Sequence, residues 1–180
     1  MCAAERSRNF EVLGVLIEAG SDLNATNKDG ETPLMLAAKD NWRPEMLNLL
    51  IAAGSDLNAT NKNGETPLML AAKHNCEPEV LSVLIEAGSD LNATNEDGET
   101  LLMLAAKCNR NPEMLSVLIE AGSDLNATSK DGETPLILAA KYSKNPENLR
   151  LLITAGSDVN RTDTSGKNAL DYALNNSKRR

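Results

Sequence analysis

Hydrophobic and polar positions follow a pattern that repeats every 34 residues along this chain. A block of five apolar residues, such as Leu34–Ala38, begins each unit. After a short polar segment comes an apolar stripe at i, i+3 and i+4, as at Leu47, Leu50 and Ile51. A segment rich in turn formers, such as SDLNATNKNG at 55–64, leads to the next block. Each unit therefore predicts two short antiparallel helices followed by a projecting turn.

The expected helix ends carry local signals. Thr32 precedes Pro33, so its hydroxyl can cap free backbone N–H groups while proline suits the first helical position. Pro44 and Glu45 open the second helix in the same way, with an acid near the helix N-terminus. Gly54 lies where a left-handed C-cap is expected. Because neither helix is long enough to be stable alone, the units must stack and bury one another's apolar faces.

A ten-residue phrase marks every unit. GETPLMLAAK, with small changes, begins at residues 30, 64, 98 and 132, and a divergent copy, GKNALDYALN, begins at residue 166. So short a period predicts one elongated domain rather than two globular ones. We expect a capping helix pair at 1–20, full units at 21–54, 55–88, 89–122 and 123–156, and a truncated cap at 157–180.

These motifs give the chain a family resemblance. TPL followed by LAA, a second helix and then AGSDLNA resembles the ankyrin repeat, and the resemblance covers essentially the whole chain. It implies an all-α solenoid of antiparallel helix pairs with projecting β-turn or hairpin loops. It also implies binding of protein partners by turn tips and first helices on a concave face. Two features depart from the family: the period is 34 rather than 33, and its usual histidine is replaced by Met35, Met69, Met103 and Ile137.

Comparison of the units locates variable positions in the segment between the two helices. The rest of each unit is nearly constant, whereas here the residue changes between acid, imidazole, thiol and phenol. Such changes are tolerated where packing does not decide the residue, so we expect the side chains at these positions to be exposed. They form four columns along the array, and for the fourth column partial burial in helix packing is the alternative. The four columns are Asp40, His74, Cys108 and Tyr142; Trp42, Cys76, Arg110 and Lys144; Arg43, Glu77, Asn111 and Asn145; and Met46, Val80 and Met114.

Together with the turn tips, these columns predict a ribbon that contacts a partner protein. Trp42 is the leading anchor because it is large, unique and set in an otherwise polar segment. The alternative is that its ring folds onto the neighbouring unit. Asn111 and Asn145 also suit the N-cap of the second helix. Secondary candidates for partner contact are Arg43, Arg110 and Tyr142.

Composition and residue spacing argue against several classes of function. The net charge of −8 disfavours nucleic-acid binding, and no apolar run approaches the ~20 residues of a membrane-spanning helix. Three cysteines without a secretory segment fit a reducing, cytoplasmic location. Glu31 and its equivalents recur one period apart, too far for a catalytic carboxylate pair. We expect them to be solvated acids at helix starts.

No enzymatic or metal-binding motif emerges from the sequence. His74 and Cys76 are two residues apart, Cys108 lies one period from His74, and Asp40 is the only other candidate ligand nearby. A zinc ion needs about four converging ligands, and the stacking distance of one unit holds Cys108 and Asp40 too far from His74. No Gly-rich phosphate loop or nucleophile–base pair is present. We therefore expect no enzyme activity, cofactor or metal, and a monomer.

The sequence thus favours a non-enzymatic scaffold that recognises a partner protein through rigid surface complementarity. Dense variation in one segment, beside scattered single changes elsewhere, is typical of an engineered repeat library. Recent gene duplication with selection on one face produces the same pattern. The alternatives are a repeat scaffold without a selected target and a natural bacterial or parasite protein that engages host proteins.

Overall fold

The computed structural model describes residues 3–40, 44–74, 78–108, 111–143 and 145–177, and these residues form ten helices. Their side chains are described except at residues 3–9, 108 and 176–177. In chain order the helices are α1 (Ala3–Glu18), α2 (Pro33–Lys39), α3 (Pro44–Ala52), α4 (Pro67–His74), α5 (Pro78–Glu86), α6 (Leu101–Cys108), α7 (Pro112–Glu120), α8 (Pro135–Tyr142), α9 (Pro146–Thr154) and α10 (Ala169–Ser177).

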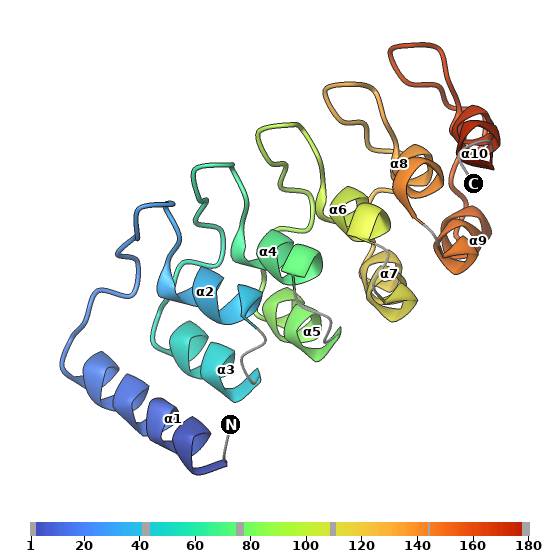
Figure 1. Cartoon of the computed structure of the whole chain (residues 1–180). Helices are drawn as coiled ribbons and strands as arrows, with labels where there is room; N and C mark the ends of the chain where they lie inside the picture. The colour runs from blue at the N-terminus through green and yellow to red at the C-terminus, as the bar shows by residue number, and fades with distance from the viewer. Residues whose placement is uncertain (1–2, 41–43, 75–77, 109–110, 144, 178–180) are drawn as a thin grey trace.

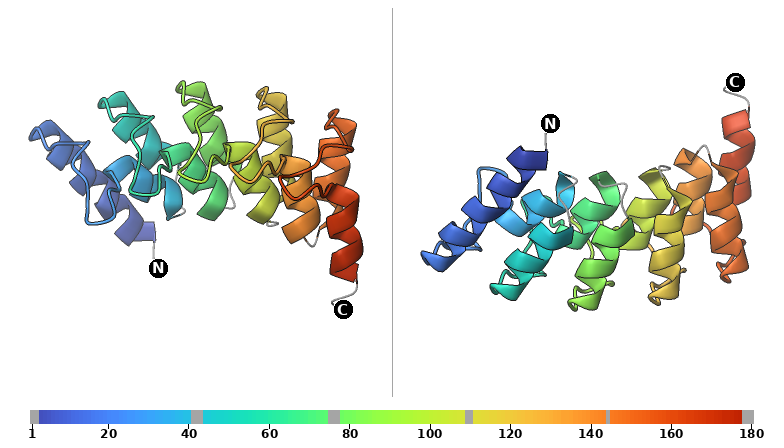
Figure 2. Two further views of the ribbon diagram at one scale, coloured as in Figure 1. Left: turned by 90° about the horizontal axis from the view of Figure 1, so that it is seen from above. Right: turned by 90° about the horizontal axis from the view of Figure 1, so that it is seen from below.

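The helices form two layers with a row of loops projecting from one of them (Figure 1). The inner layer contains α2, α4, α6, α8 and α10, and each of these packs against its neighbours in the layer. The outer layer contains α1, α3, α5, α7 and α9. Of these, α3, α5, α7 and α9 each pack against the inner helix of the same unit. Figure 2 shows the resulting elongated array. The expected all-α solenoid is confirmed, and its loops contain only one isolated β-bridge among the described residues, between Thr94 and Thr100.

An aliphatic core fills the space between the two layers. The leucines at one equivalent position of α2, α4, α6 and α8 are at most 2 % exposed; they are Leu34, Leu68, Leu102 and Leu136. Ala37 and Ala38, which follow in α2, are fully buried and let neighbouring inner helices approach closely. The residues at the family's histidine position, Met35, Met69, Met103 and Ile137, are buried too. Apolar packing has therefore replaced the polar contact that a histidine would make.

The helix ends follow the sequence signals. Thr32 Oγ1 accepts a hydrogen bond from the backbone N–H of Met35, and Pro33 is the first residue of α2. Gly54 has a φ of 97°, the left-handed conformation expected after α3. Helix α6 begins at Leu101 without a proline, so the proline that begins α2, α4 and α8 is not required here, and the buried Thr100 hydroxyl forms no hydrogen bond with any described residue at this helix start.

The N-terminal unit differs from our expectation of a helix pair. Helix α1 is continuous from residue 3 to residue 18. In the other units a proline begins the outer helix and forces the residue before it out of the helical conformation. Phe10 stands at that position here, so nothing interrupts the helix.

Hydrogen bonds connect each projecting loop to the loop of the next unit. Lys62 N donates to the backbone oxygen of Asp29 at 3.1 Å. Asp56 N donates to Asn24 Oδ1 at 2.9 Å, and both contacts recur further along the array. The loops therefore form a braced row rather than independent projections, and they lie side by side over the inner helices in Figure 2.

Candidate protein-binding face

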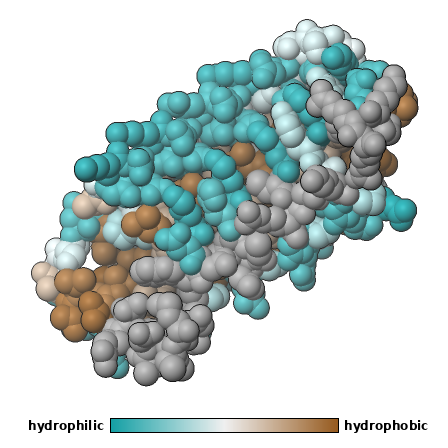
Figure 3. All heavy atoms as spheres, viewed as in Figure 1, coloured by the Kyte–Doolittle hydropathy of each residue, from teal (hydrophilic) through white to brown (hydrophobic). Residues whose placement is uncertain are grey.

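The loops and the inner helices form one side of the array, which we call the loop-side face. It comprises the turn tips at 28–29, 62–63, 96–97 and 130–131 and the adjoining helices α2, α4, α6 and α8. Hydrophilic residues cover the loops on this side (Figure 3). The geometry of the face is set by a polar network that repeats from unit to unit.

Each of the first three loops closes around one asparagine, at Asn27, Asn61 and Asn95. Asn27 Oδ1 accepts hydrogen bonds from the backbone N–H groups of Asp29 and Glu31, at 2.9 and 3.0 Å. Asn27 Nδ2 donates to Glu31 Oε2 at 3.0 Å. The asparagine therefore sets the turn and also orients the glutamate that follows it.

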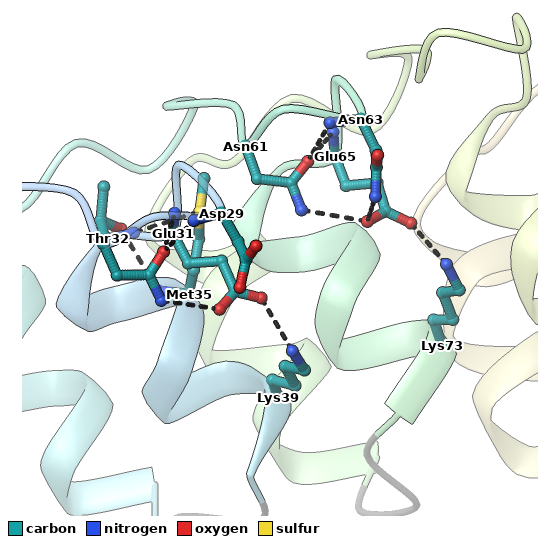
Figure 4. Close-up of polar contacts among 10 residues, drawn as sticks. Asp29, Glu31, Thr32, Met35, Lys39, Asn61, Asn63, Glu65 and Lys73 are labelled. Carbon is teal, nitrogen blue, oxygen red and sulfur yellow. Dashed lines mark hydrogen bonds and ion pairs between the residues drawn. The ribbon is translucent and has the colours of Figure 1, made fainter.

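That glutamate binds the lysine eight residues later, at the end of the inner helix. Lys39 Nζ donates to Glu31 Oε1 at 2.8 Å, and Lys73 Nζ makes the same contact with Glu65 (Figure 4). The pair recurs at 2.6 Å in the next two units, as Glu99–Lys107 and Glu133–Lys141. These four ion pairs join each of the first four loops to the last turn of its own inner helix.

The expectation of solvated acids at these positions is wrong. Glu31 is 7 % exposed and Glu65 is 3 % exposed, because each loop folds back over its inner helix and covers the carboxylate. Sequence reasoning also missed the lysine partner. The signal was present, since glutamate and lysine recur eight residues apart in all four full units.

The pKa shifts agree with this pairing. The hydrogen bond from Lys39, followed by the one from Asn27, lowers the pKa of Glu31. Burial acts to raise the pKa of Glu65, but hydrogen bonds from Lys73 and Asn61 outweigh it and the pKa is lowered. The hydrogen bond to Glu31 raises the pKa of Lys39. Both members of the pair are therefore held in their charged forms.

Open hollows lie between successive ion pairs. One, of about 320 Å³, is bordered by Glu31 and Lys39 of one unit and by Glu65 and Lys73 of the next. A second, of about 410 Å³, lies one unit further along, where the bordering pairs are Glu65–Lys73 and Glu99–Lys107. These hollows are polar and charged, which suits hydrogen bonding to a partner more than burial of a large apolar side chain.

The last unit has a different network. Asp163 takes the place of the loop asparagine, and Lys167 takes the place of the glutamate. Asp163 accepts hydrogen bonds from the N–H groups of Ser165 and Lys167 and from the Tyr172 hydroxyl. Burial acts to raise the pKa of Asp163, but these hydrogen bonds, led by that of Tyr172, lower it overall. The closing unit thus keeps its loop geometry without a glutamate–lysine pair.

An exposed aromatic ring lies near this end of the face. Tyr142, the last residue of α8, is 48 % exposed. Lys107 Nζ and Lys141 Nζ lie 5.6 and 5.2 Å from the centre of its ring, within reach of a cation–π interaction. Lys141 Nζ is also 5.1 Å from the centre of the Tyr172 ring. Tyr142 is therefore an accessible aromatic group held between two fixed cations.

The structure places some of the predicted contact residues at the edge of this face. Asp40 and His74 are exposed at the ends of α2 and α4, as Tyr142 is at the end of α8. Cys108 ends α6, and its side chain lies outside the described part. Six further predictions fall outside the described residues: Trp42, Arg43, Cys76, Glu77, Arg110 and Lys144.

Two members of the third column have a structural role. Asn111 Oδ1 accepts a hydrogen bond from Glu113 N, and Asn145 Oδ1 accepts one from Glu147 N, each at 3.0 Å. The predicted N-caps of α7 and α9 are confirmed. Capping uses the acceptor oxygen of each side chain. The structure does not test whether these asparagines also contact a partner, so that contact remains a prediction.

The fourth column requires a correction. Met46, Val80 and Met114 are 8 %, 0 % and 4 % exposed, because this position in the outer helix faces the core between the layers. These three side chains cannot contact a partner in the intact array. The alternative of burial in helix packing is therefore the correct one.

The described residues set limits on other kinds of site. None of their helices is long and apolar enough to cross a membrane. No group of three His, Cys, Asp or Glu side chains among them is placed to hold a metal ion.

Comparison with known families agrees with the geometry of the array. A family model described as ankyrin repeats (3 copies) matches residues 1–95, 43–129, 76–163 and 102–179. Among curated proteins, none matches this sequence. The overlapping matches together extend over nearly the full length of the chain.

Proposed function

Because the chain belongs to the ankyrin repeat proteins, we propose that it is a non-enzymatic scaffold whose loop-side face binds a partner protein. The observation that carries this proposal is the double bracing of the first four loops. An ion pair between a buried glutamate and a partly exposed lysine fixes each of them to its inner helix, and a backbone hydrogen bond fixes it to the next loop. Side chains held in fixed positions lose little conformational entropy on binding, so such a face favours specific recognition.

The charge of the face suggests the chemistry of the partner. Charged and amide side chains line the hollows. The lysines stay partly accessible although each is paired with a glutamate, and the Lys73 side chain, for example, is 40 % exposed. We therefore propose that polar and charged groups of the partner enter the hollows. An apolar or aromatic side chain would contact Tyr142, and Asp40 and His74 would contribute polar contacts along the edge.

The unit-to-unit variation bears on origin. A nearly constant frame with variation concentrated between the helices supports an engineered binding scaffold, and we keep that as part of the proposal. Duplication within a natural gene, for example in a bacterium or parasite whose ankyrin protein engages host proteins, accounts for the same pattern. Finding the gene in a genome would exclude the engineered origin.

The test is comparative capture with matched baits. The chain, a Trp42→Ala/Tyr142→Ala variant and an Asn48→Ala variant are immobilised, and proteins retained by each are identified by mass spectrometry. Asn48 is exposed on the outer helix α3, so its variant is the control. We expect a partner retained by the chain and by the control but lost, or weakened at least tenfold, with the double variant. A partner that binds all three equally would overturn the proposed face. An absence of any partner at micromolar concentration would favour a scaffold without a selected target.

A further inference from the structure

The tip of the second loop contains the one asparagine–glycine pair in the sequence, Asn63 followed by Gly64. A backbone nitrogen can attack the carboxamide of the asparagine that precedes it, and glycine hinders this attack least because it has no Cβ. The other full units have aspartate at the same position, at Asp29, Asp97 and Asp131. The second loop is therefore the one place where a loop tip can lose an amide by this route.

The side chain of Asn63 is exposed, whereas the backbone on both sides of it is held. Gly64 N donates to Asn61 O, and Asn63 O accepts from Glu96 N of the next loop, each at 3.0 Å. Asn63 Nδ2 donates to Glu65 Oε2 at 3.5 Å (Figure 4). The Gly64 nitrogen and the Asn63 carboxamide thus have separate partners in the closed loop, so the attack requires the loop to open.

Three further contacts keep this loop closed. Asn61 Oδ1 accepts from the N–H groups of Asn63 and Glu65, both at 2.9 Å. Asn61 Nδ2 donates to Glu65 Oε2 at 3.0 Å, and Lys73 Nζ donates to Glu65 Oε1 at 2.8 Å. Because the Glu65 side chain is only 5 % exposed, loss of its cation weakens the whole closure. The frequency with which the loop opens is therefore set by the Glu65–Lys73 pair.

We propose that Asn63 is a modification site at which the loop itself supplies the nucleophile, and that the Glu65–Lys73 pair controls the rate. In the open loop, base removes the proton of Gly64 N, and the nitrogen forms a bond to Asn63 Cγ. The carboxamide C–N bond breaks and ammonia leaves, which gives a cyclic imide. Water then opens the imide at one of its two carbonyl carbons, giving aspartate or isoaspartate. The reaction needs no partner protein, so it does not depend on the function proposed above.

The modification changes the loop-side face at two hollows at once, because Asn63 borders both of them. Each hollow gains a negative charge when the neutral amide becomes a carboxylate. The aspartate product should keep the loop closed, since Asp29 and Asp97 make the same backbone contact in their own loops. In the isoaspartate product the chain runs through the former side chain. The carbonyl that accepts from Glu96 N then leaves the backbone, and the bracing to the next loop is lost.

The test compares the rate of amide loss in folded chains and in a free peptide. The unmodified chain, Lys73→Met and Lys141→Met are incubated under one set of conditions beside a synthetic peptide of residues 58–68. Lys141→Met is the matched control, because it removes the same kind of ion pair from the fourth unit, whose loop has Asp131 in place of an asparagine. Mass spectrometry of proteolytic peptides, in water enriched in heavy oxygen, locates and times the change.

Circular dichroism verifies that each chain is folded. If Lys73→Met does not fold, Glu65→Gln replaces it, with Glu133→Gln as the matched control. These variants remove the same two ion pairs but leave an amide in place of each buried carboxylate.

We expect Asn63 to lose its amide in every chain, while the asparagines of the other loops keep theirs over the same interval. The unmodified chain should react more slowly than the peptide by about tenfold or more, because its loop is closed most of the time. Lys73→Met should react faster than both the unmodified chain and Lys141→Met, by about threefold or more.

Three outcomes would overturn the proposal. A rate in the unmodified chain equal to that of the peptide would show that the loop does not restrain the reaction. Equal rates in Lys73→Met and Lys141→Met would show that the Glu65–Lys73 pair does not control it. An intact Asn63 in every chain after the peptide has reacted completely would exclude the modification site itself.

Discussion

Lys73 Nζ donates a hydrogen bond to Glu65 Oε1 at 2.8 Å, and the two side chains differ widely in exposure, 40 % for the lysine and 5 % for the glutamate. The contact joins the base of a projecting loop to the last turn of α4. The glutamate side chain is buried, whereas the lysine side chain is partly exposed to water. Removal of the lysine should therefore have a different effect on stability from removal of the glutamate. The glutamate depends on the lysine more than the lysine depends on the glutamate.

Lys73→Met should destabilise the array by about 1–3 kcal/mol, because it leaves a buried carboxylate without its cation. Glu65→Gln should cost less, since an amide needs no counter-charge and the freed Lys73 ammonium can be hydrated. The free energy of unfolding is measured by urea titration. The control is Lys62→Met, an exposed lysine at the turn tip, which should change stability by no more than about 0.5 kcal/mol. The opposite order of the first two effects would contradict this account of the pair.

The same pairs predict how stability depends on pH. Glu31 and Glu65 have pKa values lower in the folded chain than in the unfolded chain. Their contribution is fully present above the unfolded value of about 4.3 and is lost as the pH falls through the lowered, folded pKa. The hydrogen bonds to Glu31 and Glu133 raise the pKa values of Lys39 and Lys141. Their contribution is fully present below about pH 10.4 and is lost as the pH rises further.

We therefore expect a plateau of stability around neutral pH, with a loss on each side. Urea midpoints measured across the pH range would reveal it. A Glu31→Gln/Glu65→Gln variant should lose less stability on the acid side than the unmodified chain, because two of the titrating carboxyls are gone. An acid limb of unchanged slope in that variant would show that other groups control acid unfolding.

Much of the fold could be predicted from the sequence because its signals are local. Thr32 and Pro33 set the start of α2 through their own backbone chemistry, and Gly54 sets the end of α3. The burial of Glu31 could not be predicted in this way, since it depends on a loop folding back over a helix that follows it. A polar residue at a helix start is usually solvated, and only the lysine eight residues on indicated otherwise.

Contacts across units account for the remaining differences. Leu16 and Met46 both lie on the apolar stripe of an outer helix, yet Leu16 is exposed and Met46 is buried. The difference comes from what packs against each helix. The sequence shows the same apolar spacing in both places. The continuity of α1 was open to prediction, because the missing proline at Phe10 is a local signal. For the binding face, variation among units predicted the exposure of Tyr142 but left burial of Val80 open as an alternative, and only the packing of the outer helix decides that Val80 is buried.

The loop of the fourth unit differs from the earlier loops at one position, and the difference can be reversed by mutation. Ser129 replaces the asparagine of the earlier loops, and its Oγ accepts a single hydrogen bond, from Glu133 N at 3.2 Å. Ser129→Asn should stabilise the array by about 0.5–1.5 kcal/mol, because the amide can also donate to the Glu133 carboxylate. The reciprocal change, Asn61→Ser, should destabilise by a similar amount, since Asn61 Nδ2 donates to Glu65 at 3.0 Å. Urea unfolding of both variants measures this, and a common sign for the two changes would refute it.

Two glycines with the same backbone conformation should respond differently to alanine. Gly54 and Gly64 both have positive φ, 97° and 72°. A Cβ on Gly54 would meet nothing within 4 Å, whereas one on Gly64 would lie 3.0 Å from the backbone nitrogen of Glu96 in the next loop. Gly54→Ala should therefore cost about 1–2 kcal/mol from backbone strain alone. Gly64→Ala should cost more, because the added methyl also displaces the hydrogen bond from Glu96 N to Asn63 O.

Thermal and urea unfolding of both variants would measure the difference, with Gly14→Ala as the matched control. Gly14 lies within α1, and a Cβ there would meet nothing within 4 Å. Alanine should stabilise that helix by about 0.5–1 kcal/mol, so the control should change stability in the opposite direction. Equal losses for Gly54→Ala and Gly64→Ala would mean that the loop of one unit does not press on the loop of the next. The braced row of loops, on which the proposed binding face depends, would then have to be abandoned.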